Sequence, residues 1–291
     1  MTSPGSCSPG AYPPPRALLE RHGLGPKRSW GQNFLADPAV LDAIAELASP
    51  PAGEPVVELG AGLGHLTVRL AARGARVIAV ERDRDMARVL RAELGDGIEL
   101  VEADAARIDW PALADRLGTA RLAVAGNLPY HLSSPILFSL LDRPDRIARA
   151  VFLLQREVAD RLAASPGTKE FGLLSVLLQR EAEVRVALKV PSAAFLPPPR
   201  VESAVLVAGF RPPPGGPLDA ALLRRLVKAG FAQRRKTLSN ALGAARIVPD
   251  DTLAWALAQA GVDPGRRGET LEVAEWEALA RAIAPLAGSV R

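Results

Sequence analysis

Val56-Val57-Glu58-Leu59-Gly60-Ala61-Gly62-Leu63-Gly64 is a short apolar run that leads directly into a glycine-rich turn. The apolar run is typical of a buried strand. The three glycines allow backbone conformations barred to other residues, and they let a ligand approach the main chain closely. The spacing is G-x-G-x-G, and the third glycine of the dinucleotide fingerprint would fall at His65. This departure weakens the interpretation as an NAD site.

The pattern of strands and helices extends outward from this turn. From about residue 51 to residue 188, apolar runs alternate with amphipathic segments, which is the pattern of a parallel α/β sheet. We predict strands at Pro55–Leu59, Arg76–Glu81, Ile98–Val101, Leu122–Ala125, Ala150–Leu154, Glu183–Lys189 and Ser203–Phe210. Helices are predicted at Met86–Leu94 and Ser134–Leu141, and beyond a proline- and glycine-rich linker at Leu218–Leu242, Asp251–Gly261 and Val273–Ala284.

These elements divide the chain into three predicted parts. Residues 1–25 begin with a stretch rich in proline, glycine and serine, and we expect a disordered or poorly ordered tail. Residues 26–210 are predicted to form an α/β domain, and residues 211–291 a small helical domain. A length of 291 residues suits one large domain and one smaller one.

The composition favours a globular protein without metal. Hydrophobic residues make up 48% of the chain and charged residues 23%. The single cysteine, Cys7, permits neither a disulfide framework nor a cysteine metal cluster. His22, His65 and His131 are scattered and lack metal-ligand spacing. No apolar run is long enough to span a membrane and the opening residues lack an export signal, so we expect a cytoplasmic protein.

Positive charge is concentrated near the end of the sequence. Residues 211–291 hold 12 Lys and Arg against 8 Asp and Glu, which accounts for the whole net charge of +4. Between Ala221 and Arg246 there are seven basic residues and no acidic one. This asymmetry predicts a surface for a polyanion such as RNA, although a solvated helix face would look the same. The candidate phosphate contacts are Arg224, Arg225, Lys228, Arg234, Arg235 and Lys236.

Two acidic residues follow the second and third predicted strands. Glu81 comes 21 residues after Gly60, where a carboxylate can accept hydrogen bonds from both hydroxyls of a ribose. Asp104 is placed to receive the amine of an adenine. S-Adenosylmethionine fits these elements, because it carries an adenine, a ribose with two free hydroxyls and no pyrophosphate that needs a helix N-terminus. Tight turns with surface acids are the plainer alternative.

Asn127-Leu128-Pro129-Tyr130 follows the fourth predicted strand. Pro129 keeps Leu128 out of helical geometry, so the Leu128 carbonyl can project outward. The Asn127 amide offers a second acceptor, and Tyr130 offers a face for stacking. This combination suits the exocyclic amine of a planar base, held beside the methyl group of the cofactor. An ordinary strand-to-loop turn is the alternative for the tetrapeptide alone.

Eight short motifs occur in a fixed order along the chain. They are Gly31–Leu35, Glu58–Gly64, Asn127–Tyr130, Gln155–Val158, Phe171–Ser175, Val190–Phe195, Pro197–Val205 and Phe231–Leu238. With these motifs the sequence resembles the ribosomal RNA small subunit adenine dimethyltransferases (the KsgA/RsmA family) over roughly residues 26–279. The glycine motif is shared by many methyltransferases, whereas the ordered set of eight is highly specific.

The resemblance implies a Rossmann-like class I S-adenosylmethionine-dependent methyltransferase domain, with a seven-stranded, mostly parallel sheet, followed by a small C-terminal helical domain. The implied cofactor contacts are Asn33, Leu35, Gly60, Glu81, Asp104 and Asn127, to which the glycine turn adds Gly62. The catalytic set is Asn127, Leu128, Pro129, Tyr130 and Phe195. In this scheme Tyr130 stacks on one face of the adenine, and Phe195 closes the other face; a core aromatic is the alternative for Phe195.

The same resemblance implies the substrate and the partners. The family methylates two adjacent adenosines in the loop of a hairpin near the 3′ end of 16S rRNA, so the partner is the small ribosomal subunit, with a second role in its assembly. A monomer is the default. Two departures from the family lie near the site: Trp30 stands where phenylalanine is usual, and His131 where asparagine is frequent. A catalytic base at His131 is the less favoured alternative to the amide mechanism.

Three other functions compete with this one. A resistance dimethylase acting on large-subunit rRNA shares the first motifs, but Pro197–Arg200 and Arg234–Lys236 favour the small-subunit enzyme. A DNA adenine methyltransferase would need a sequence-reading domain, which is not visible. A non-catalytic assembly factor is disfavoured because the acids and Asn127 are intact.

Overall fold

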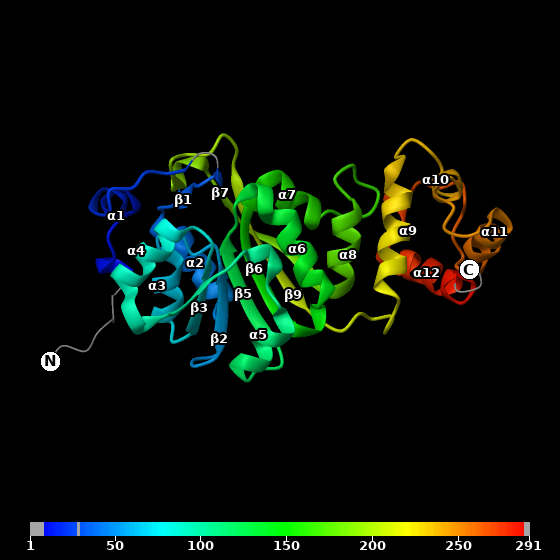
Figure 1. The fold of residues 1–291 in the computed structure, drawn as a ribbon. Helices are drawn as coiled ribbons and strands as arrows, with labels where there is room; N and C mark the ends of the chain where they lie inside the picture. The colour runs from blue at the N-terminus through cyan, green and yellow to red at the C-terminus, as the bar shows by residue number, and fades with distance from the viewer. Residues whose placement is uncertain (1–8, 28–29, 288–291) are drawn as a thin grey trace. The chain divides into compact units, whose positions relative to one another are not determined.

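The structure of the chain is a computed structural model that describes residues 9–27 and 30–287 (Figure 1). Cys7, on which the expectation about disulfides and metals partly rests, lies outside the described residues. The described residues form two compact units. The first comprises the chain up to residue 159 together with residues 183–211, and the second comprises residues 160–182 and 212 onward.

A seven-stranded mixed sheet organises the first unit. Its strand order is β4-β3-β2-β5-β6-β9-β7. The pairs from β4 to β6 are parallel, and β9 is antiparallel to β6. The strands are β2 (Pro55–Leu59), β3 (Arg76–Glu81), β4 (Glu99–Glu102), β5 (Leu122–Asn127), β6 (Ile147–Gln155), β7 (Ala182–Val190) and β9 (Ser203–Phe210). The predicted α/β sheet is therefore confirmed.

The strand order reverses beside β2. From β2 the chain continues to β3 and β4 on one side, whereas β5 and β6 lie on the other side. Val56 of β2 is paired with both Val77 of β3 and Ala123 of β5. In open parallel sheets ligands bind beyond the carboxyl ends of the strands at such a reversal. Gly60 and Asn127 lie at this point, because each stands at the carboxyl end of one of the two central strands.

Helices cover the sheet and supply its core. The helices of this part of the chain are α1 (Pro15–Arg21), α2 (Pro38–Ala48), α3 (His65–Ala72), α4 (Arg84–Leu94), α5 (Trp110–Leu117), α6 (Ser133–Asp142) and α7 (Arg156–Leu162). Helix α2 starts at a cap in which Asp37 accepts the Ala39 and Val40 N–H groups, with Pro38 in its first turn. Ile44 and Ala45 of α2 are fully buried and belong to one cluster with Val56, Val151 and Val205 of the sheet. Burial of this apolar face fixes α2 on the sheet.

A separate two-stranded ribbon joins distant parts of the first unit. Strand β1 (Phe34–Leu35) runs antiparallel to β8 (Phe195–Leu196), with Leu35 opposite Phe195. The N–H groups of Ala36 and Asp37 both donate to the Ala194 carbonyl, at 2.8 and 3.2 Å. The segment before the first strand of the sheet is therefore held by main-chain bonds to the loop after β7.

The residues before position 26 differ from the predicted poorly ordered tail. Residues 9–25 are described and include the helix α1, in which Leu18 and Leu19 are buried. The Tyr12 hydroxyl donates to the Leu63 carbonyl at 2.7 Å, and the Tyr12 ring meets the His65 ring edge-on. The apolar residues interspersed among the prolines are the physical reason for the difference, because they cover the outer side of the glycine turn.

The second unit consists of helices. They are α8 (Leu173–Glu181), α9 (Ala220–Ala232), α10 (Leu238–Ala245), α11 (Asp250–Gln259) and α12 (Val273–Ala287). In its interior Trp276 stacks on Phe231, and Phe231 also meets Phe171. Arg180 pairs with Glu277 at 2.7 Å and with Glu181 in the same buried cluster.

Two predicted boundaries change in this unit. Residues 160–182, which we assigned to the α/β domain, group with the helices instead, because α8 packs on α9 and α12. The single helical stretch predicted for Leu218–Leu242 is interrupted at residues 233–237, where Thr237 caps the start of α10 by accepting the Asn240 N–H. Within the described residues no helix combines the length and the apolar character needed to cross a bilayer.

Candidate active site

Three neighbouring cavities open at the carboxyl ends of β2, β3 and β5. Between them they are lined by all seven predicted cofactor residues: Asn33, Leu35, Gly60, Gly62, Glu81, Asp104 and Asn127. Gly60 lines all three cavities, so they meet at the glycine turn. The structure therefore brings together residues that lie up to 94 positions apart in the sequence.

The glycine turn needs its glycines for conformation and for space. Gly60, Gly62 and Gly64 have φ of 72°, 56° and 84°, in the left-handed region that other residues avoid. A Cβ atom on Gly64 would lie 2.9 Å from the Tyr12 hydroxyl oxygen and 3.1 Å from a Leu90 methyl carbon. The turn is thus enclosed on its outer side and bare on the side of the cavities.

Glu81 ends β3 with its carboxylate held by the backbone. One oxygen accepts the Gly62 N–H and the other accepts the Asp83 N–H, both at 2.8 Å. The side chain is 8% exposed, and burial raises the pKa of Glu81 while these N–H donors oppose the rise. Each carboxylate oxygen can accept a further hydrogen bond. The two carboxylate oxygens are therefore acceptors that fit the two hydroxyls of a ribose.

Asp104 lines the second cavity at the end of β4. Its Oδ1 accepts the Ala106 N–H at 3.0 Å, and its Oδ2 pairs with Arg82 at 3.2 Å. The Arg82 guanidinium carbon lies 5.7 Å from the centre of the Trp30 ring, and Trp30 lines both the first and the second cavity. An adenine amine directed at Asp104 must therefore share this carboxylate with Arg82.

Asn127 has an orientation set by its hydrogen bond. Its Nδ2 donates to the Asn33 carbonyl at 2.9 Å, so its Oδ1 is the atom turned away from Asn33. The preceding residue is Gly126, where a Cβ would lie 2.5 Å from the Leu59 carbonyl oxygen. Only glycine allows β2 and β5 to approach this closely, and the approach places Asn127 beside the glycine turn.

The rest of the predicted tetrapeptide forms one wall of the first cavity. Leu128, Pro129 and Tyr130 all line it. The Leu128 N–H donates to the Leu153 carbonyl, which anchors the residue to the end of β6. The Tyr130 hydroxyl lies 2.9 Å from the Ser203 Oγ, and burial raises the pKa of Tyr130.

Phe195 and His131 are not among the described residues that line the first cavity with the tetrapeptide. The Phe195 side chain is 3% exposed and belongs to the hydrophobic core with Leu35, and Phe195 is absent from the described lining of the three cavities. Stacking by Phe195 would require the loop before β8 to open, so this role stays a prediction. His131 lines the second cavity together with Asp104, on the side of the predicted adenine site.

Glu58 is a further site residue, to which the sequence motifs assign no role. It is 2% exposed, lines the third cavity, and accepts a hydrogen bond from the Thr67 hydroxyl at 2.6 Å. Burial raises the pKa of Glu58 to about 8. The available signal was an acid inside an otherwise apolar strand, which is uncommon without a specific partner.

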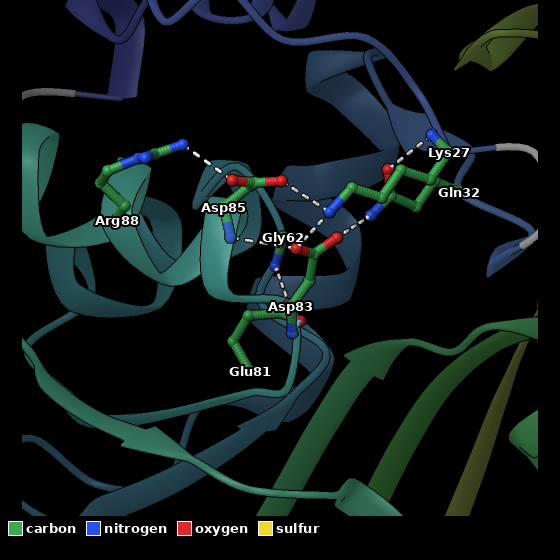
Figure 2. A network of polar contacts seen from close by, with 7 residues as sticks. All are labelled: Lys27, Gln32, Gly62, Glu81, Asp83, Asp85 and Arg88. Atoms are coloured by element: carbon green, nitrogen blue, oxygen red, sulfur yellow. Dashed lines mark hydrogen bonds and ion pairs between the residues drawn. The ribbon is translucent and has the colours of Figure 1, made fainter.

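A polar network that the sequence did not predict lies beside Glu81 (Figure 2). Asp83 receives the Lys27 ammonium at 2.6 Å and the Gln32 side-chain amide at 2.8 Å. The residues that meet there come from the segment before β1 and from the turn between β3 and α4. No local pattern in the sequence connects them.

The predicted phosphate contacts divide into two groups. We expected Arg234, Arg235 and Lys236 on a basic helix, but they lie in the turn between α9 and α10, and all three are exposed. The Arg234 guanidinium donates to the Lys169 carbonyl at 2.6 Å and to the Phe171 carbonyl at 3.1 Å. Arg234 therefore holds the loop before α8. Arg225 and Lys228 are exposed on α9, and Arg224 is partly buried there.

The sheet with its reversal point, the bare glycine turn and the two strand-end acids define the class of S-adenosylmethionine-dependent methyltransferases with a Rossmann-like fold. The family described as ribosomal RNA adenine dimethylase matches residues 24–284. The chain belongs to this family.

Similar proteins agree with that assignment. The Ribosomal RNA small subunit methyltransferase A of Anaeromyxobacter dehalogenans (strain 2CP-C) is 68% identical over 94% of this chain and 98% of its own length. The protein of the same name from Myxococcus xanthus is 52% identical over 94% of this chain and 96% of its own length.

Among solved structures, a dimethyladenosine transferase from Plasmodium falciparum superposes with a TM-score of 0.72, covering 88% of this chain and 98% of its own; at 23% identity it supports the fold alone. The 23S rRNA methyltransferase ErmE superposes with a TM-score of 0.63 at 29% identity, covering 86% of this chain and 99% of its own.

Proposed function

We propose that this enzyme dimethylates the N6 amines of two adjacent adenosines in the loop of a hairpin near the 3′ end of small-subunit rRNA. The observation that carries the proposal is the fixed amide of Asn127, which presents an acceptor oxygen at the meeting point of the cavities. The relatives named for the small-subunit rRNA support the choice of substrate.

The proposed work of the protein is to hold the amine in the reactive geometry. An adenine amine is a poor nucleophile, because its lone pair is delocalised into the ring. The Asn127 Oδ1 and the Leu128 carbonyl accept the two amine hydrogens, which favours a tetrahedral nitrogen with its lone pair directed at the cofactor. S-Adenosylmethionine, when bound, supplies a methyl group on a positively charged sulfur. Alignment provides most of the acceleration in this scheme.

A general base has only a small part in this scheme. Once the nitrogen has gained a methyl group it is cationic, and it loses a proton readily. His131 lines the second cavity with Asp104 rather than the first cavity with Asn127, which supports a scheme without it. Tyr130 holds the base by stacking, which contributes about 1–3 kcal/mol per base and offsets the few kcal/mol needed to extrude a loop adenosine.

The second unit is proposed to bind rRNA phosphates. Arg225, Lys228, Arg235 and Lys236 are exposed, and lysine and arginine clusters give affinity without sequence information. The partner in this proposal is the immature small ribosomal subunit in the cytoplasm, where the enzyme, as a monomer, also assists assembly.

The similarity to ErmE favours a second candidate, methylation of an adenosine in large-subunit rRNA. A direct assay separates the two. The purified protein is incubated with labelled S-adenosylmethionine and either unmethylated small subunits or large subunits. We expect dimethyladenosine at two adjacent loop positions of the small-subunit rRNA. Label confined to the large-subunit RNA would overturn the proposal in favour of the second candidate.

A further inference from the structure

We propose that Asp83, acting through Gln32, is a positioning residue that holds the segment of Asn33 in place and thereby orients the amide of Asn127. This inference rests on the proposed function, since it concerns how the same amide is aimed. Neither Asp83 nor Gln32 belongs to the predicted cofactor or catalytic residues. Their proposed role is indirect, because each acts through the Asn33 main chain.

Asp83 is the centre of the network in Figure 2. Its side chain is 3% exposed and carries a carboxylate, which is unfavourable to bury without partners. Oδ1 receives the Lys27 ammonium at 2.6 Å and the Asp85 N–H at 3.0 Å, and Oδ2 receives the Gln32 Nε2 at 2.8 Å. The hydrogen bond to the Asp83 carboxylate stabilises the charged Lys27 ammonium and raises its pKa.

Two of these three donors come from the segment before β1. If Lys27 and Gln32 moved away, the buried carboxylate would keep the Asp85 N–H from its own helix α4. Leaving a buried charge with so few partners is strongly unfavourable, so Asp83 selects the conformation in which the segment is docked. Gln32 is further tied to this segment because its Oε1 accepts the Lys27 N–H at 2.9 Å.

The docked segment is what aims Asn127. Gln32 immediately precedes Asn33, whose carbonyl accepts the Asn127 Nδ2. On the other side of Asn33, Phe34 and Leu35 are paired with β8. The Asn33 carbonyl is therefore fixed between two anchors, a side-chain anchor at Asp83 and a main-chain anchor at β8. Releasing the first anchor frees the carbonyl to move and the Asn127 amide to rotate.

The same residue also contacts the predicted ribose acid. The Asp83 N–H donates to the Glu81 Oε1, while the other Glu81 oxygen accepts the Gly62 N–H. Asp83 thus touches both the acid predicted to bind the cofactor and the segment that orients the amine-binding amide. A purely structural role as the cap of α4 would need only its bond to the Asp85 N–H.

The test compares Gln32→Met and Asp83→Asn with Asp85→Asn. Gln32→Met keeps the length of the side chain and removes both its donor to Asp83 and its acceptor for the Lys27 N–H. Asp83→Asn retains a residue able to cap α4, but its amide cannot accept from Gln32 and Lys27 at once. Asp85→Asn is the matched control, because it also removes a carboxylate paired with Lys27, at 2.7 Å, whereas Figure 2 draws no hydrogen bond between Asp85 and Gln32.

Two readouts are measured on the full chain. One is the kcat for methylation of unmethylated small subunits, together with the KM for the subunit. The other is hydrogen exchange of the peptide containing residues 31–36 in the protein without cofactor. For Gln32→Met and Asp83→Asn we expect kcat to fall at least about tenfold, with little change in the KM for the subunit, because small misplacements of reacting groups are costly. Exchange of the N–H of residue 32, which bonds to the Lys27 carbonyl in the part of the segment that is released, should become faster.

The control should leave both readouts near those of the unaltered protein. If Gln32→Met and Asp83→Asn change kcat and exchange no more than Asp85→Asn does, the positioning role is wrong. Faster exchange without a loss of kcat would also overturn it, since the segment would then be released without consequence for the amide. An unaltered protein that fails to methylate small subunits would instead overturn the proposed function.

Discussion

The side-chain amide of Asn127 donates to the main-chain carbonyl of Asn33 across 2.9 Å, and this bond joins residues 94 positions apart. Asn127 ends β5 at the reversal point of the sheet, whereas Asn33 lies in the segment before the first strand of that sheet. The bond decides which atom of the amide is available to a ligand. It also makes the segment around Asn33 part of the proposed active site without requiring that its side chain touch the base.

Asn127→Ala should abolish most of the turnover. In the proposed mechanism it removes the acceptor that holds the adenine amine, and loss of one such preorganised group typically lowers kcat by about 10²–10³-fold. Binding to unmethylated small subunits should remain, because the exposed cations of the second unit are untouched. Single-turnover methylation and subunit binding in the same buffer measure the two effects. Loss of binding together with turnover would assign Asn127 a different role.

Arg82→Met should tighten cofactor binding slightly. Arg82 is 60% exposed and occupies the Asp104 Oδ2, and an exposed ion pair contributes about 0–1 kcal/mol, so its removal should lower the Kd by no more than about fivefold. Calorimetric titration with S-adenosylmethionine measures the change. Arg91→Met is the control. This substitution removes the same charge, but Arg91 pairs with Glu102 and not with Asp104. Weaker binding for Arg82→Met alone would mean that Arg82 holds the adenine.

The stability of the cofactor-free protein should fall as the pH rises through neutrality. Burial raises the pKa of Glu58 from about 4.5 to about 8. Between these values the folded protein holds a proton that the unfolded chain has lost, so the free energy of unfolding decreases with pH and levels off above about 8. The slope from this one group is at most about 1.4 kcal/mol per pH unit. Glu58→Gln should flatten it in urea unfolding curves.

The measurement is cleanest between pH 7 and 8. Burial lowers the pKa of His65 to about 4, so this group stays neutral when folded while the unfolded imidazole titrates near 6.5. The stability that the neutral His65 contributes is lost as the pH falls from about 6.5 to about 4. In that range His65 therefore makes the free energy of unfolding increase with pH, whereas Glu58 makes it decrease. An unaltered slope in Glu58→Gln above pH 7 would contradict the assignment.

Arg234 should behave differently from its two neighbours. Replacing both Arg235 and Lys236 by alanine should weaken rRNA binding and reduce the slope of log K against log salt by roughly 1.5, as expected for two lost phosphate contacts.

Arg234→Ala should mainly destabilise the second unit, by about 1 kcal/mol, because Arg234 donates to the Lys169 and Phe171 carbonyls. Salt titrations of binding and thermal unfolding of each variant separate these outcomes. An equal change of salt slope for Arg234→Ala would place it among the phosphate contacts.

Elements with strong local signals could be predicted from the sequence almost to the residue. Strands β2, β3 and β9 have the predicted bounds, because each is an apolar run delimited by turn-forming or charged residues. The glycine turn, Glu81 and Asn127 followed from their positions at strand ends in a parallel sheet, where strand ends of distant sequence converge.

Features that depend on long-range contacts could not be predicted in this way. Strand β1 has two residues and exists only because β8 is beside it. The bond between Lys27 and Asp83 joins residues 56 positions apart, and no local sequence pattern at either residue predicts a contact with the other. The burial of α1 was hidden by a proline- and glycine-rich composition, in which a few well-placed apolar residues decide the outcome.

The contact of Tyr12 with Leu63 and Gly64, behind the glycine turn, acts as a brace for this turn. This brace has a consequence for how the chain can be shortened. The family match begins at residue 24, so the brace lies ahead of the part that defines the family. Trimming the protein to the family boundaries would remove Tyr12 and α1, uncover Leu63 and Gly64, and open the cofactor turn to water from its outer side. A fragment designed by homology alone would keep every predicted catalytic residue and lose the support behind the glycine turn.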